Sequence, residues 1–148
     1  MSVVFALATP PSKSAICVFR VSGNGCNKYL RKMFVEKEFL PNKFYTRLLK
    51  KGNKIIDKVG LVVFKGPKSY TGEDSFEIYA HGSLAVMSSI IDLFKALGLE
   101  EAVAGEFTKR AFLNNKITLN EAESLNDLIK CQDGFGLALL SLIHISEP

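Results

Sequence analysis

The segment from Gly105 to Ile129, GEFTKRAFLNNKITLNEAESLNDLI, constrains the fold of this chain more than any other stretch. A glycine turn opens a short helical run, and the pair Asn114-Asn115 ends it. Thr118 and Glu121 then have the spacing of a capping box, in which each side chain bonds the backbone amide of the other residue. The segment therefore predicts two helices with a sharp break between them, the second with an apolar face suited to packing on another helix.

The residues before this segment alternate between strand-like and helix-like runs. Gly52-Asn53 separates two of the strand-like runs and predicts an antiparallel hairpin at residues 51–54. Strands are expected at residues 3–9, 14–21, 44–49, 55–64, 75–80 and 99–104, and helices at 24–34 and 83–97. This order predicts an α+β domain, with helices packed on a mixed β-sheet.

The expected helix at residues 83–97 has the strongest periodicity in the chain. Leu84, Met87, Ile91 and Phe94 follow an apolar stripe at helical spacing, and Gly98 is placed to end the helix. Further apolar residues widen the stripe. We therefore expect this helix to be buried over most of its surface.

Composition excludes some classes of protein and leaves others open. Hydrophobic residues make up 47% and charged residues 23%, which is ordinary for a globular domain. Three cysteines without metal-type spacing suit a reducing cytoplasm, and Cys17 lies in an apolar run that predicts a small buried side chain. No run reaches the length of a membrane span. The net charge of +4 is spread along the chain, which argues weakly against an RNA-binding surface.

Three charged residues are candidates for binding chemistry, each with a structural alternative. Arg20 interrupts an apolar strand, where it is either exposed or paired at a sheet edge, or it recognises an anion. Glu77 alternates with apolar neighbours, so it is either solvated or accepts the N–H edge of a heterocycle. Lys116 follows the Asn-Asn break, where it is either a solvated turn lysine or a cation beside a cleft.

Two other polar motifs give less information about function. The loop GPKSYTGED at residues 66–74 lacks the glycine spacing of a Walker phosphate loop, and no other stretch of the 148 residues supplies it. His81 ends a strand and is expected to be a hydrogen-bonded structural residue. Because no clustered ligands accompany it, we expect no metal site.

Three motifs in order resemble the N-terminal domain of the bacterial tRNA-modification GTPase family MnmE, also called TrmE. They are ATPPSKSAICVFRVSG (8–23), FKGPKSYTGEDSFEIYAHG (64–82) and AGEFTKRAFLNNKITLNEAESLNDLI (104–129), within a similarity that spans residues 3–130. The chain also departs from the family pattern. The family usually has glycines at the positions of Ser12, Ser14 and Ala15, a second glycine at Ser83 and a proline at Ala104.

The resemblance implies a division of the chain. Residues 1–117 would form a folate-binding and dimerisation domain related to that of the aminomethyltransferases, and 118–133 would begin a helical domain. Residues 134–148 resemble cloning sequence and are expected to be a non-native tail. In the family, GTP and potassium bind in a GTPase domain whose motifs these residues lack, so we do not expect this fragment to be catalytic alone.

The resemblance also implies ligands and partners. The expected ligand is 5-formyl- or 5,10-methylene-tetrahydrofolate, and the expected partners are a second copy, the flavoprotein MnmG (GidA) and tRNA, whose wobble uridine is modified. Arg20, Glu77 and Lys116 match the family's folate contacts, with Glu77 accepting the pterin N–H edge and the two cations bonding carbonyl and carboxylate oxygens. Two alternatives stay open: a stand-alone aminomethyltransferase-like enzyme, and a ligand-free dimerisation or RNA-docking module.

Overall fold

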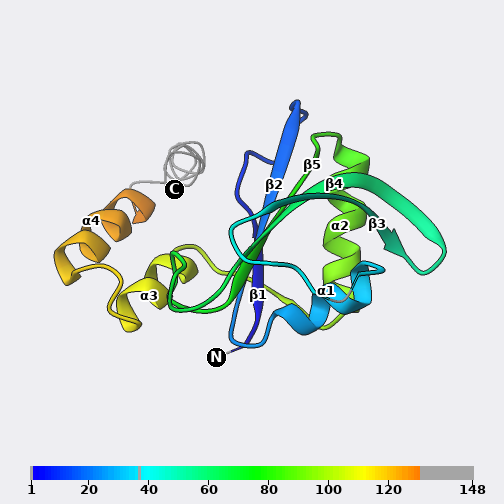
Figure 1. Ribbon diagram of the computed structural model, residues 1–148. Coiled ribbons are helices and arrows are strands. Elements are labelled where there is room, and N and C mark those ends of the chain that lie inside the picture. Colours follow the sequence, from blue (N-terminus) through cyan, green and yellow to red (C-terminus); the bar gives the residue numbers. More distant parts are fainter. Residues whose placement is uncertain (1, 37, 131–148) are drawn as a thin grey trace.

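The computed structural model of the protein describes residues 2–36 and 38–130 (Figure 1). The expected α+β class is confirmed, and every expected element is present with bounds within about three residues of those predicted. In chain order the elements are β1 (Val4–Leu7), β2 (Ile16–Ser22), α1 (Asn27–Met33), β3 (Phe44–Lys51), β4 (Lys54–Phe64), β5 (Ser75–His81), α2 (Leu84–Ala96), β6 (Glu100–Glu101), α3 (Glu106–Leu113) and α4 (Leu119–Lys130).

The strands form one mixed sheet in the order β3-β4-β5-β2-β1-β6. Neighbouring strands are antiparallel except β1 and β6, which are parallel. The register aligns one residue from each of five strands in a row across the sheet. In order along this row lie Phe44, Val62, Glu77, Arg20 and Ala6.

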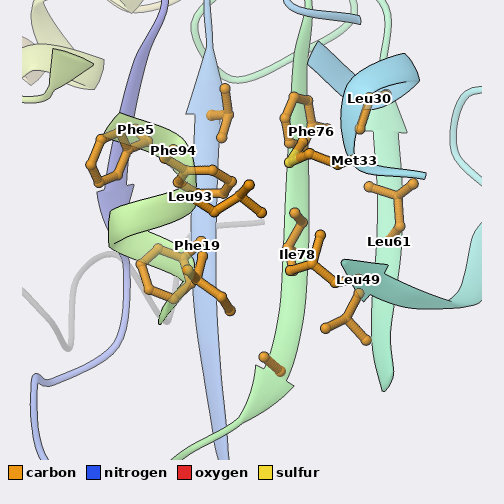
Figure 2. Packing of buried hydrophobic residues seen from close by; sticks show 14 of the residues in the cluster. Phe5, Phe19, Leu30, Met33, Leu49, Leu61, Phe76, Ile78, Leu93 and Phe94 are labelled. Carbon is orange, nitrogen blue, oxygen red and sulfur yellow. The ribbon is translucent and has the colours of Figure 1, made fainter. Parts of the chain in front are cut away.

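The hydrophobic core lies between the sheet and the helices α1 and α2 (Figure 2). Phe94 of α2 makes edge contacts with Phe5 and Phe19, at ring-centroid distances of 5.1 and 5.7 Å. Phe76 and Ile78 of β5 face the same core and are fully buried. The strand residues that alternate with these point to the opposite face, which we call the open face of the sheet.

Helix α2 is less buried than its sequence predicts. Met87, Ile90, Leu93 and Phe94 are buried, but Leu84 is 61% exposed. The helix has the sheet on one side, so only the stripe that faces the sheet is covered and the expectation of burial over most of its surface is wrong. Its ends follow the prediction. The Ser83 hydroxyl caps the first turn, and Gly98, with a φ of +93°, follows the last.

Helices α3 and α4 lie to one side of the sheet (Figure 1). The predicted capping box is present, since the Thr118 amide donates to Glu121 Oε1 at 3.1 Å and the Glu121 amide donates to Thr118 Oγ1 at 3.2 Å. None of the helices described could span a membrane. The predictions for residues 131–133 and for the tail at 134–148 lie outside the described residues.

Candidate functional site

Arg20 and Glu77 form an ion pair on the open face of the sheet. They are directly opposite in the β2–β5 register, and Arg20 Nε donates to Glu77 Oε2 at 2.9 Å. The side chains are only 9% and 14% exposed. The structure thus brings together two of the three predicted site residues and makes them partners, and it favours the alternative in which Glu77 is not solvated.

Tyr79 holds the second oxygen of the carboxylate. Its hydroxyl donates to Glu77 Oε1 at 2.5 Å, from the next outward-facing position on β5. Burial, and then the neighbouring carboxylate, raise the pKa of the Tyr79 phenol well above its usual value, so the phenol remains a donor at neutral pH. Both oxygens of Glu77 therefore accept one bond each, and the carboxylate is fixed in place.

The guanidinium of Arg20 retains donors for another group. Within the described residues, hydrogen bonding of Arg20 is confined to Nε, and its carbon Cζ lies 5.9 Å from the ring centroid of Tyr70. A cavity of about 50 Å³ lies beside the ion pair. Its lining residues are Arg20, Ser22, Phe64, Tyr70, Thr71, Ser75 and Glu77.

Lys116, the third predicted residue, lies close to this cavity without lining it. Its side chain is exposed and packs against the 65–74 loop at Gly72, where an added β-carbon would lie 3.3 Å from Lys116 Cγ and 2.7 Å from Asn114 Cβ. Gly72 has a φ of +80°, so both its backbone conformation and its neighbours favour glycine. Gly72 follows Thr71, which lines the cavity, so the loop separates Lys116 from the ion pair.

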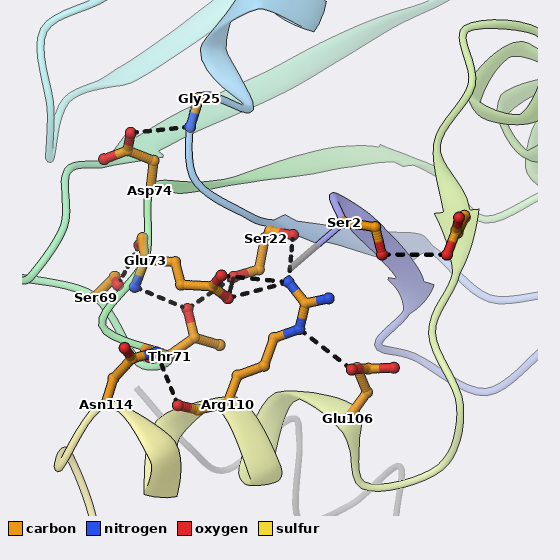
Figure 3. A network of polar contacts seen from close by, with 11 residues as sticks. Ser2, Ser22, Gly25, Ser69, Thr71, Glu73, Asp74, Glu106, Arg110 and Asn114 are labelled. Carbon is orange, nitrogen blue, oxygen red and sulfur yellow. Dashed lines mark hydrogen bonds and ion pairs between the residues drawn. The ribbon is translucent and has the colours of Figure 1, made fainter.

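A buried polar network joins this loop to α3 (Figure 3). Arg110 Nη1 donates to Glu73 Oε1 at 3.1 Å and to the carbonyl of Ser22 at 3.3 Å. The hydroxyls of Ser22 and Thr71 share a hydrogen bond of 2.7 Å, and Asn114 donates to the carbonyl of Thr71 at 2.8 Å. Since Ser22 and Thr71 also line the cavity, this network fixes two of its walls.

Sequence reasoning missed most of the residues that shape the site. The sequence places Arg110 in a short helical run and Glu73 in a turn and indicates no special role for either, although both are almost fully buried. The signal was weak, because a glutamate in a glycine-rich turn and an arginine on a short helix are usually solvated. Tyr79 carried a usable signal, since it is two positions from Glu77 and therefore on the same face of the strand.

Three other features lie outside the Arg20–Glu77 site. His81 Nδ1 bonds Asp57 Oδ1 at 2.8 Å, in keeping with its predicted structural role, although its ring is largely exposed. Among the described residues, no group of three potential ligands could hold a metal ion.

A second cavity, of about 340 Å³, lies between α3 and α4, with Phe112, Val103 and Ala122 among its lining residues.

Comparison with known proteins assigns the family. A family model described as "GTP-binding protein TrmE N-terminus" matches residues 3–116, which include all three predicted site residues. The chain belongs to this family. The match covers all of the sheet and ends just before the capping box of α4.

Relatives of known function share this N-terminal part. The tRNA modification GTPase MnmE of Thermotoga petrophila is 40% identical over 140 residues, which is 94% of this chain and 31% of that protein. The same-named proteins of Fervidobacterium nodosum and Helicobacter pylori are 41% and 38% identical, over 92% and 88% of this chain. The chain spans about a third of the length of the relatives it matches.

Proposed function

We propose that this chain is the N-terminal, folate-binding part of a tRNA-modification GTPase. The relatives that support the proposal are named tRNA modification GTPases, and each matches this chain over less than a third of its own length. In the full assembly, this part would pair with a second copy and act with the MnmG (GidA) flavoprotein on the wobble uridine of tRNA. GTP and potassium would bind elsewhere in the assembly.

The observation that carries the folate proposal is that Arg20 is buried with hydrogen-bond donors left over. Its guanidinium is buried beside a cavity, and within the described residues its two Nη groups have no acceptor. A buried donor without a partner is costly, so a ligand carbonyl or carboxylate oxygen would be favoured there. Glu77 adds a carboxylate that can accept N–H groups, which matches the donor and acceptor edge of a reduced pterin.

The volume of the cavity limits how a folate is held. About 50 Å³ admits only a few water-sized groups, whereas sites for ligands of this size span roughly 300–1,000 Å³. Only the polar edge of 5-formyl- or 5,10-methylene-tetrahydrofolate would therefore enter the cavity beside the Arg20–Glu77 pair. Lys116, on the outer side of the loop, would meet an anionic part of the ligand that extends beyond the cavity. The bound folate would supply the one-carbon unit of the modification.

Calorimetry with 5-formyltetrahydrofolate tests the proposal on the 148-residue chain. Arg20→Lys keeps the charge but loses the planar fork, and Glu77→Gln keeps the shape but loses the charge. We expect each to weaken binding by about 10-fold or more, since hydrogen bonds to charged groups contribute about 1.5–3 kcal/mol. Lys116→Ala should weaken it less, because Lys116 is exposed.

Arg31→Ala is the matched control, because Arg31 is an exposed arginine on α1. It should bind folate as the parent chain does. If Arg20→Lys and Glu77→Gln both keep the parent affinity while remaining folded by circular dichroism, the site assignment is wrong. If the parent chain binds no reduced folate at any accessible concentration, the proposed ligand is wrong.

A further inference from the structure

The hairpin of β3 and β4 extends past the rest of the sheet (Figure 1). Strand β4 has 11 residues, but β5 pairs only with its second half, from Gly60 to Phe64. Strand β3 pairs with β4 over its whole length, from Phe44 to Lys51. Residues 47–58, which we call the basic ribbon, therefore form a two-stranded ribbon. Strand β5 pairs with none of these residues.

The basic ribbon concentrates positive charge. It contains five basic residues and one acidic residue, a local charge of +4 that equals the formal charge of the whole chain. Arg47 is paired with Glu36 at 2.6 Å, and the acid, Asp57, bonds His81. Within the described part of the chain, ion pairs involve none of the four lysines, which are Lys50, Lys51, Lys54 and Lys58. The charge is thus clustered, in contrast to the expectation of a spread distribution.

A cavity of about 300 Å³ adjoins the basic ribbon. Its lining includes the cations Arg47, Lys50 and Lys58, the carboxylate Glu36 that pairs with Arg47, and the apolar residues Val35 and Leu48, which are 87% and 46% exposed. Apolar surface next to lysine ammonium groups suits a nucleotide, whose base and sugar need cover and whose phosphate needs a cation.

One end of the basic ribbon, at Lys58, shares a face with the candidate folate site. In β4, Lys58, Gly60 and Val62 alternate onto the open face of the sheet, and Val62 is directly opposite Glu77. A polyanion that contacts Lys58 would therefore lie on the face that carries the Arg20–Glu77 pair, whereas Lys51 and Lys54, which are directly opposite each other, alternate away from Lys50 onto the other face of the ribbon. The distance along β4 from Lys58 to Val62 is four residues, or about 13 Å at the rise of a strand.

We propose that the basic ribbon binds the phosphate backbone of RNA. This proposal rests on the proposed function, because a cationic surface could bind any polyanion, and the proposed tRNA substrate is the reason to choose RNA. Unpaired lysines on a two-stranded ribbon can follow a sugar–phosphate chain, and neutralising phosphates releases counterions, which drives the binding. The contacts are to phosphate, so the ribbon positions the RNA and other parts of the assembly read its sequence.

The test compares two variants of the 148-residue chain that lose the same charge. One replaces Lys50, Lys51, Lys54 and Lys58 with Gln, and the control replaces the exposed lysines Lys13, Lys28, Lys95 and Lys109 with Gln. Binding to fluorescein-labelled tRNA is followed by anisotropy from about 50 to 200 mM salt. We expect the ribbon variant to bind at least about 10-fold more weakly, with a salt slope lower by about 3, since each lost phosphate contact removes about 0.7–0.9.

The control should retain nearly the parent affinity. Equal weakening in both variants would mean that overall charge decides the binding, and would overturn the proposal. No binding of tRNA by the parent chain would also overturn it, as would ribbon-dependent binding to phosphatidylserine vesicles without binding to tRNA.

Folate calorimetry on the same variants separates this proposal from the previous one. The ribbon variant should bind 5-formyltetrahydrofolate as the parent chain does, and Glu77→Gln should bind tRNA as the parent chain does. A variant that loses only folate binding therefore tests the folate-site proposal. A variant that loses only tRNA binding tests the basic-ribbon proposal.

Discussion

At the scale of single residues, the least expected feature is the burial of Arg110 with Glu73. Their side chains are 2% and 6% exposed, and Arg110 also bonds the Ser22 carbonyl and Glu106. Two buried charges stabilise a fold only when each is paired and hydrogen-bonded, because desolvation costs several kcal/mol for each ion. The main effect of the pair is therefore to fix where the 65–74 loop lies on α3, and its net contribution to stability is small.

Removing one partner of this pair should be costly. Arg110→Met leaves the Glu73 carboxylate buried without its cation, and we expect the free energy of unfolding in urea to fall by about 3 kcal/mol. Replacing both residues, as in Arg110→Met with Glu73→Met, should recover part of that loss. A double variant less stable than the single one would contradict this account of the network.

Buried cysteine thiols should resist modification. Burial, and then the nearby carboxylates of Asp74 and Glu73, raise the pKa of the Cys26 thiol to about 12, so thiolate is scarce at neutral pH. We expect iodoacetamide to leave Cys26 unlabelled in the folded chain and to label it once urea unfolds the protein, as measured by peptide mass spectrometry. Rapid labelling of Cys26 under native conditions would show that α1 opens.

At the scale of elements, local signals predicted the helices, the strands and the β3–β4 hairpin, whereas the pairing of strands distant in the sequence could not be predicted. Thr118 with Glu121, Ser83 and Gly52-Asn53 act over a few residues, so capping and turn rules find them. The order of strands depends on packing of the whole core, and no local pattern specifies it. Arg20 and Glu77 were each placed on a strand by their sequence, but their pairing is a consequence of the β2–β5 register.

The contact between β4 and the end of β5 should depend on pH. Burial acts to raise the pKa of the Asp57 carboxyl, but hydrogen bonds from the backbone and ring of His81 outweigh it and hold the pKa below its usual value. A lowered folded-state pKa gives stability that is present above the unfolded pKa of about 3.9 and is lost as pH falls through the folded value.

Asp57→Asn should therefore destabilise the chain by about 1 kcal/mol at pH 7, and its difference from the parent should shrink as the pH falls below about 4. Chemical unfolding at several pH values measures this. Asp92→Asn, at an exposed position on α2, is the control and should change little. A penalty for Asp57→Asn that does not change down to acid pH would assign the effect to packing and not to charge.

At the scale of the whole molecule, the open face of the sheet is incomplete as a ligand site. It carries the Arg20–Glu77 pair and the exposed Phe44 ring, which lies 5.9 Å from the ring of Tyr79, but its cavity is only about 50 Å³. A folate-sized ligand needs more enclosing surface than the described residues supply beside this pair. The second copy in the proposed homodimer is the candidate for the missing walls.

Folate affinity should then depend on protein concentration. If the site is completed by a second copy, dilution below the dimer dissociation constant weakens folate binding, and saturating 5-formyltetrahydrofolate shifts the chain toward dimers by mass action. Sedimentation velocity with and without folate, paired with equilibrium dialysis at two protein concentrations, measures both effects. Arg31→Ala should behave as the parent chain, whereas Arg20→Lys should lose the folate-induced shift. An unchanged folate affinity at concentrations where the chain sediments as a monomer would show that one chain suffices, and would require the 65–74 loop to open instead.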